Sequence, residues 1–238
     1  MSNNFFRFKR FVVYQDRAAM KVGTDGVLLG GLVRMESGEE PRRILDIGTG
    51  TGLVALMLAQ RYERAEVVGI DIDESAVGQS RDNFEMSEFS SRLRAEIADV
   101  RDYDGGRFDM IVSNPPFFTS SLECPDDRRT MARHASQMPM EVLVGGMARM
   151  LNEGGTAAVI LPYDQAERIV EQMGRKGLVE KSRTTIYTTS RKPPKRVVST
   201  FVWGKDGEVK TEYGQLTLLN GDGTRSDEYQ EALKDYYL

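Results

Sequence analysis

The sequence has 238 residues, of which 40% are hydrophobic and 29% are charged, so it is long enough for one sizeable core or two small ones. A formal net charge of −4 argues against non-specific binding to nucleic acid through overall charge, although it leaves room for a local basic face. No apolar segment reaches the length of a signal peptide or a membrane span, and the single cysteine, Cys124, suits a reducing compartment. We therefore expect a soluble, cytoplasmic protein.

The first elements in chain order are a short hairpin and a helix. Aromatic and basic side chains alternate in the stretch FRFKRF, which predicts a short strand or hairpin. Thr24 or Asp25 is then placed to cap an apolar helix. No Ser/Gly linker or low-complexity tract divides the chain, so residues 1–238 are expected to form a single domain.

Strands and helices then alternate along the chain. The predicted strands are, in order, the apolar runs RRILDI, EVVGIDI, LRAEIAD, FDMIVSN and GGTAAVILP. Two β-prone stretches at 179–189 and 196–204 follow without a helix between them, and a possible hairpin (209–219) and a polar helix (226–237) come last. This order predicts an α/β fold: a Rossmann-like, mostly parallel sheet with an antiparallel addition at one edge. In such sheets, ligands bind beyond the carboxyl ends of the strands.

A glycine-rich turn follows the first of these strands. The segment DIGTGTG contains Asp46, Gly48, Gly50 and Gly52, and glycines allow a backbone to turn sharply and to approach a ligand closely. The spacing G-x-G-x-G differs from the G-x-G-x-x-G of dinucleotide-binding proteins, which disfavours an oxidoreductase. Alone, the turn is a weak signal.

Two more acids end the next two strands. Asp71 is placed to accept hydrogen bonds from both hydroxyls of a ribose, and Asp99 is placed to accept one from an adenine amino group. Either acid alone is more simply a helix cap, but together with the glycine turn they outline an adenosine ligand. No Gly-Lys-Ser/Thr segment is present to hold a triphosphate, so we predict S-adenosylmethionine as the cofactor.

The fourth strand ends in the stretch SNPPFF. Two consecutive prolines continue neither a helix nor a sheet, so they fix a rigid kink after Asn114. The Asn114 side-chain oxygen and the Pro115 carbonyl can each accept one N–H bond of an exocyclic amine, which would orient its nitrogen lone pair. Phe117, after Pro116, can stack on the planar group that carries the amine. These four residues are the predicted catalytic set, and no metal is expected.

The motifs DIGTGTG, GIDID and NPPF, in this order, resemble those of class I S-adenosylmethionine-dependent methyltransferases that act on amino nitrogens. The segments KVGTDGVLLG, ARHASQMPMEVL and RKPPKRV extend the resemblance to the bacterial valine-tRNA adenine-N6 methyltransferases. This resemblance implies a seven-stranded sheet whose last strand is antiparallel, and methylation of the adenosine at position 37, just 3′ of the anticodon. It also implies that residues 1–34 are an extension covering the cofactor site. Many relatives have tyrosine where this sequence has Phe117.

Basic clusters are the expected contacts to tRNA, because basic side chains bind phosphates. The candidate residues are Arg128, Arg129, Arg133, Arg191, Lys192, Lys195 and Arg196. A charged run is more often simply a solvated surface, but Pro193 and Pro194 hold the second cluster in a fixed loop. We expect a monomeric enzyme. The alternatives are methylation of another RNA or of a protein glutamine, and a non-catalytic module that binds S-adenosylmethionine.

Overall fold

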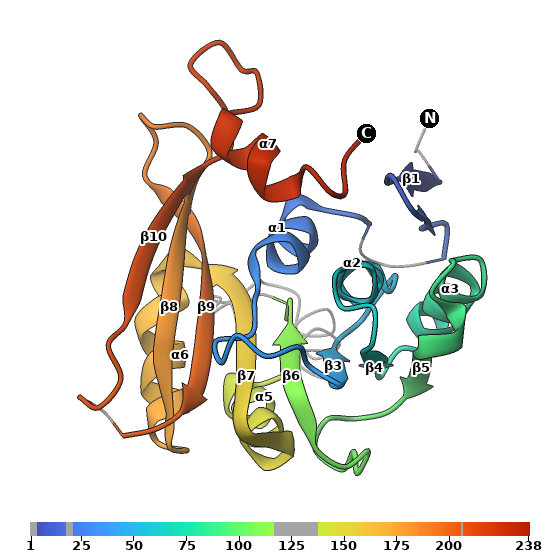
Figure 1. The fold of residues 1–238 in the computed structure, drawn as a ribbon, viewed down its shortest axis with the longest axis horizontal. Coiled ribbons are helices and arrows are strands. Elements are labelled where there is room, and N and C mark those ends of the chain that lie inside the picture. The colour runs from blue at the N-terminus through green and yellow to red at the C-terminus, as the bar shows by residue number, and fades with distance from the viewer. Residues whose placement is uncertain (1–3, 18–20, 117–137, 206) are drawn as a thin grey trace, which may run out of the picture.

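The computed structural model of the chain describes residues 4–17, 21–116, 138–205 and 207–238 (Figure 1). Its centre is an eight-stranded sheet with the strand order β10-β8-β9-β7-β6-β3-β4-β5. The strands are β3 (Arg43–Ile47), β4 (Glu66–Asp71), β5 (Leu93–Ile97), β6 (Phe108–Ser113), β7 (Leu151–Pro162), β8 (Leu178–Tyr187), β9 (Pro194–Trp203) and β10 (Glu212–Thr217). Only β9 runs antiparallel to its neighbours, which confirms the predicted α/β, mostly parallel architecture.

The strand count is eight rather than the predicted seven. Residues 209–219 were expected to form a hairpin, but they contribute one strand, β10, which pairs in parallel with β8. The antiparallel strand is also not at the outer edge, because β9 lies between β7 and β8. Burial explains the order: residues 197–201 of β9 are buried, as an interior strand requires, whereas residues 212–215 of β10 are exposed.

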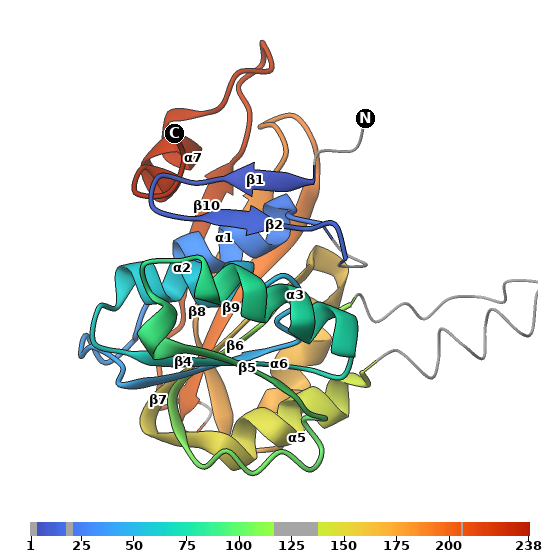
Figure 2. The same ribbon diagram turned by 90° about the vertical axis from the view of Figure 1, so that its right-hand side faces the viewer.

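Helices cover both faces of the sheet. They are α1 (Thr24–Leu32), α2 (Leu53–Arg61), α3 (Glu74–Glu85), α5 (Met140–Met150), α6 (Ala166–Gly174) and α7 (Asp227–Leu233), with 3-10 turns η1 (Ser90–Arg92) and η2 (Tyr163–Gln165). Apolar side chains of α1, α2 and α3 pack in one core cluster, and those of α5 and α6 pack in a second. Figure 2 shows α2 and α3 above the sheet and α5 below it. No described helix is long and apolar enough to cross a membrane.

The predicted N-terminal hairpin is confirmed. Strands β1 (Phe5–Arg7) and β2 (Val12–Tyr14) pair antiparallel and lie above α2 and α3 (Figure 2). Phe8, in the turn between them, stacks on Phe11 with ring centroids 4.6 Å apart and on Tyr237 with centroids 5.9 Å apart. The Lys9 amide also donates a 2.8 Å hydrogen bond to the Tyr236 carbonyl. An aromatic cluster and one backbone bond therefore fix the hairpin to the last residues of the chain.

The aromatic cluster predicts unequal effects of two substitutions in this hairpin. Phe8 is 2% exposed and Phe5 is 41% exposed. We expect Phe8→Ala to lower the free energy of unfolding by about 3–5 kcal/mol, because it removes a ring from a packed cluster. Phe5→Ala is the matched control, with an expected effect of about 0.5 kcal/mol or less. Urea denaturation of both variants measures the difference, and equal losses would contradict the packing described here.

Candidate active site

A pocket of about 540 Å³ opens at the carboxyl edge of the sheet, where β3, β4, β5 and β6 end. This volume is typical of a site for a small organic ligand. The acids Asp46, Asp71 and Asp99 and the amide Asn114 all line it. The structure therefore brings together polar residues that the sequence placed at four separate strand ends.

The glycine turn forms the floor of this pocket. Gly48 and Gly50 have φ angles of 74° and 55°, a conformation that side chains disfavour. A Cβ atom added at either position would meet no atom within 4 Å, so the space beside both residues is open. Both line the pocket, and a ligand can approach their backbone closely.

Gly52 has a different task from the other two glycines. It was predicted to bind the cofactor, but it is not among the residues that line the pocket. Its φ angle is 80°, and a Cβ atom there would lie 2.4 Å from the Phe84 ring of α3. Glycine at this position lets α3 pack against the turn, and it supports the pocket from outside.

Asp46 closes the glycine turn from within. Its carboxyl group is only 1% exposed and accepts a 2.8 Å hydrogen bond from the Thr49 hydroxyl. Burial raises the pKa of Asp46 to about 7; hydrogen bonds from Thr49 and from the Ala55 amide act in the opposite direction, and the nearby Asp71 carboxylate adds to the rise. Asp46 is therefore a residue that shapes the turn more than one that projects into the pocket.

Asp71 and Asp99 are held by backbone amides. The two carboxylate oxygens of Asp71 accept from the Gly50 and Asp73 amides, each at 3.0 Å. Asp99 accepts from the Arg101 amide at 2.9 Å. Each carboxylate oxygen has a second lone pair, so both acids keep the capacity to accept hydrogen bonds from a ligand.

Sequence reasoning missed an apolar part of the pocket wall. Ile72, between Asp71 and Asp73, lines the pocket and is 56% exposed, which suits a flat apolar ligand surface. Residues 21–26 line the pocket as well. The segment KVGTDG was noted in the sequence only as a mark of resemblance, although a glycine and a capping Thr-Asp pair at a helix start are themselves signals of a binding loop.

Asn114 and Pro115 line the same pocket as the glycine turn, as does Pro116. A Cβ atom on Gly26 of α1 would lie 3.8 Å from Asn114 Nδ2, so the first turn of α1 supports this amide. Asn114 is half-buried, and none of the hydrogen bonds between described residues involves its side chain. Phe117, the fourth predicted catalytic residue, lies outside the described residues.

The predicted RNA-binding residues divide into three groups. Lys195 and Arg196, at the start of β9, line the pocket, and Arg196 Nε forms a 2.9 Å ion pair with Asp25 of α1. Arg191 and Lys192 are exposed in the loop between β8 and β9 and lie outside the pocket lining. The group comprising Arg128, Arg129 and Arg133 lies outside the described residues.

The pocket fits the S-adenosylmethionine predicted from the sequence. Open space beside Gly48 and Gly50 gives a ligand access to the backbone, as an amino-acid moiety requires. Asp71 lies beside this turn with acceptor capacity for a ribose, and Ile72 offers an apolar surface for an adenine ring. The cofactor-binding role of these residues remains a prediction at this point.

The buried carboxyl of Asp46 predicts a specific pH dependence of stability. Its pKa is raised from the ordinary 3.8 to about 7, so between these values the folded state binds more protons than the unfolded state. The free energy of unfolding should therefore fall as the pH rises through this window, by at most about 1.4 kcal/mol per pH unit, and level off above it. In Asp46→Asn this contribution is absent.

Urea denaturation of the wild type and Asp46→Asn at several pH values from 5 to 8 measures the effect. We expect the stability of the wild type relative to the variant to decrease over this range. Asp222→Asn is the control, because the pKa of Asp222 is lowered by hydrogen bonds from Thr224 and the acid stays ionised throughout. A constant difference between wild type and Asp46→Asn would contradict the prediction.

Comparison with solved structures shows the fold. The chain is similar to a predicted O-methyltransferase from Agrobacterium tumefaciens, with 18% identity, a TM-score of 0.67, and coverage of 89% of this chain and 96% of that one. It is also similar to the 16S rRNA N2 G1207 methyltransferase of T. thermophilus in complex with AdoMet and guanosine, with 22% identity and a TM-score of 0.56. That match covers 84% of this chain and 49% of the other.

Comparison of sequences shows the family. Two curated relatives are both tRNA1(Val) (adenine(37)-N6)-methyltransferases. The one from Bacteroides thetaiotaomicron is 42% identical, and the one from Phocaeicola vulgatus is 43% identical. In both cases the match covers 100% of this chain and 99% of the relative. Residues 25–161 match the family model of the methyltransferase small domain. The chain therefore belongs to the methyltransferase family that this domain defines.

Proposed function

We propose that this chain transfers a methyl group from S-adenosylmethionine to the exocyclic N6 amine of an adenosine in tRNA, at position 37 of tRNA1(Val). The observation that carries the proposal is the meeting of Asn114 and Pro115 with Gly48, Gly50 and Asp71 in one pocket. Full-length similarity to two enzymes named for this reaction supports the choice of substrate.

The chain's own residues would hold the cofactor by position and by charge. Gly48 and Gly50 admit it to the backbone of the turn, and Asp71 and Asp99 accept hydrogen bonds from its ribose and its adenine amino group. When bound, S-adenosylmethionine supplies a methyl group activated by the adjacent cationic sulfur. The raised pKa of Asp46 means that a cation in the pocket also favours its ionised form.

Asn114 and Pro115 orient the target amine. An exocyclic amine has two N–H bonds, and the Asn114 side-chain oxygen and the Pro115 carbonyl can accept one each. With both N–H bonds held in this way, the remaining lone pair of the nitrogen has one direction available to it. The amine is neutral, so the site needs no strong base to make it nucleophilic. Phe117 stays the predicted stacking partner of the base.

The tRNA is proposed to contact the basic loop beside the pocket. Arg191 and Lys192 are exposed before β9, whose first residues Lys195 and Arg196 line the pocket. Because Arg196 already pairs with Asp25, we assign phosphate contact to Arg191, Lys192 and Lys195 rather than to Arg196. The predicted group comprising Arg128, Arg129 and Arg133 remains part of the proposed RNA-binding set.

Residues 1–34 are proposed to be an extension that covers the cofactor site of a single-domain enzyme. Support comes from Val22, Thr24 and Gly26, which line the pocket. We further propose that the enzyme acts as a monomer in the cytoplasm, where tRNA is modified.

Nucleoside mass spectrometry tests the function. Bulk tRNA that lacks the modification is incubated with the protein and S-adenosylmethionine, digested to nucleosides, and analysed for N6-methyladenosine. We expect the product in the tRNA1(Val) fraction and at position 37. Transfer of label from the cofactor to a protein fraction alone would overturn the proposal.

The orienting role of Asn114 predicts a separation of catalysis from cofactor binding. We expect Asn114→Ala to reduce the rate of methyl transfer at least about 10²-fold, because the amine loses one of its two acceptors. The affinity for S-adenosylhomocysteine should be nearly unchanged. Asn152→Ala is the control: Asn152 donates to Asp109 at the opposite edge of the sheet, at 2.8 Å, so this variant should retain activity. Equal loss of activity and affinity in Asn114→Ala would mean that the kink is merely structural.

The basic loop predicts a salt-dependent effect on tRNA binding. We expect the double variant Arg191→Ala/Lys192→Ala to bind tRNA more weakly, with a shallower dependence of the logarithm of affinity on the logarithm of salt, by about 0.7 per lost phosphate contact. Arg168→Ala/Arg175→Ala, on helix α6, is matched in charge and should bind tRNA as the wild type does. Fluorescence titrations at several salt concentrations measure the slopes, and identical slopes would refute the contact.

A further inference from the structure

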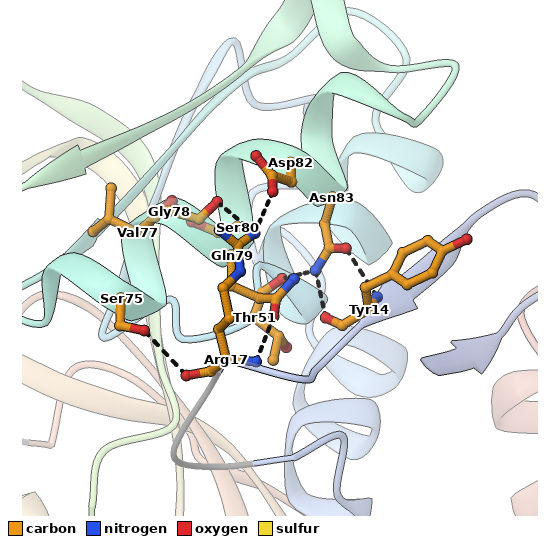
Figure 3. Close-up of polar contacts among 10 residues, drawn as sticks. All are labelled: Tyr14, Arg17, Thr51, Ser75, Val77, Gly78, Gln79, Ser80, Asp82 and Asn83. Carbon is orange, nitrogen blue, oxygen red and sulfur yellow. Dashed lines mark hydrogen bonds and ion pairs between the residues drawn. The ribbon is translucent and has the colours of Figure 1, made fainter. Parts of the chain in front are cut away.

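Helix α3 buries amide side chains on the face that it turns toward the N-terminal segment and the glycine turn (Figure 3). Asn83 is 0% exposed and Gln79 is 1% exposed. Burying an amide is unfavourable unless its donors and acceptors find partners, so a buried amide with several partners holds them in fixed relative positions. Asn83 and Gln79 therefore point to a structural requirement beyond packing.

Asn83 joins two separate parts of the chain. Its oxygen accepts from the Tyr14 amide at 2.9 Å, and its nitrogen donates to the Tyr14 carbonyl at 2.9 Å and to the Thr51 carbonyl at 2.8 Å (Figure 3). Thr51 belongs to the glycine turn and lines the pocket. One side chain thus ties the end of strand β2 to the turn that forms the pocket floor.

A second anchor continues from the same helix. The Arg17 amide donates to the Gln79 oxygen at 2.9 Å, and the Ser75 hydroxyl donates to the Arg17 carbonyl at 3.1 Å (Figure 3). The Arg17 guanidinium also pairs with the Asp82 carboxylate. Backbone and side chain of Arg17 are therefore both fixed on α3, although no apolar contact is needed to hold them.

The anchored segment continues into the pocket wall. Gln15, which is buried, accepts a 2.7 Å hydrogen bond from the Val22 amide. Val22 lines the pocket, and the following helix α1 places Gly26 beside Asn114. Hydrogen bonds therefore connect α3, through Tyr14 and Gln15, to the part of the N-terminal segment that borders the ligand.

We propose that Asn83 is a positioning residue for cofactor binding: it holds the N-terminal segment and the glycine turn in the relative arrangement that forms the pocket. The inference rests on the proposed function, because it takes S-adenosylmethionine as the ligand. Asn83 does not line the pocket itself, so its effect on affinity is exerted through Tyr14 and Thr51.

The amide chemistry of Asn83 makes the proposal specific. An aspartate at this position keeps the acceptor for the Tyr14 N–H group but loses both donors, and it faces two carbonyl oxygens with a negative charge. A leucine of similar size removes all three hydrogen bonds. If the binding-competent arrangement falls to about one-tenth of the population, the apparent Kd for the cofactor rises about tenfold.

The experiment compares Asn83→Leu and Asn83→Asp with a matched control, Gln60→Met. Gln60 is also a buried amide, but it donates to the Asp235 carbonyl at 2.8 Å, away from the pocket. Calorimetric titration with S-adenosylhomocysteine measures the Kd, and amide hydrogen exchange reports on residues 14–17 and 21–26 without ligand. Thermal unfolding shows which variants are folded at the titration temperature.

We expect a Kd raised about tenfold and faster exchange in both segments for each Asn83 variant that folds, with neither change in Gln60→Met. The kcat at saturating cofactor should stay within about twofold of wild type, since Asn114 and Pro115 are unaltered. Wild-type Kd values in a folded Asn83 variant would overturn the inference, as would failure of both variants to fold while Gln60→Met folds, because Asn83 would then serve stability alone.

The outcomes separate this inference from the proposed function. Wild-type protein that bound the cofactor but methylated a different acceptor would refute the tRNA substrate and leave the role of Asn83 intact. Wild-type protein that bound no S-adenosylhomocysteine would overturn both. A loss of methyl transfer in Asn83→Leu without any change in Kd would assign Asn83 to the acceptor side of the site and contradict its role in cofactor binding.

Discussion

The register of three parallel strands is the constraint on which the site depends. Ile47 of β3 pairs with Ile70 of β4 on one side and with Ser113 of β6 on the other. The next residue along each strand is Gly48, Asp71 or Asn114 respectively, so hydrogen bonding between backbones brings these three to one level. Parallel strands with a common register place their carboxyl ends together, and the pocket follows from this geometry before any side chain contributes.

Close packing below the glycine turn maintains that geometry. A Cβ atom on Gly69, in the middle of β4, would lie 2.5 Å from the Thr49 hydroxyl oxygen, so β4 must have glycine there for the turn to fold onto it. Thr49 in turn donates to Asp46, and the Gly48 and Thr49 amides both donate to the Ile70 carbonyl. The turn is thus fixed from one side by β4 and from the other by α3, and the ligand side stays open.

Sequence reasoning predicted those parts of the fold that depend on local pattern. The apolar runs gave β3, β4 and β6 and their ligand-bearing ends, because a buried parallel strand has a continuous apolar sequence and the next residue begins the loop. It failed at β10, where the polar sequence of residues 212–215 carries no signal of its partner, β8. The pairing of Arg196 with Asp25 joins residues 171 positions apart and was equally inaccessible to local patterns. Asn83 illustrates the same limit, since its partners are brought to it only by the folded chain.

The stacking of Phe8 on Tyr237 has a consequence for biosynthesis. The two rings are separated by 229 positions in the sequence and meet only in the folded protein. At typical translation rates, roughly 10–50 s pass between the addition of the first ring and the second. During this interval the hairpin has no final docking surface and leaves its aromatic side chains accessible to chaperones. The last step in assembling this enzyme on the ribosome is therefore the attachment of its earliest-made segment.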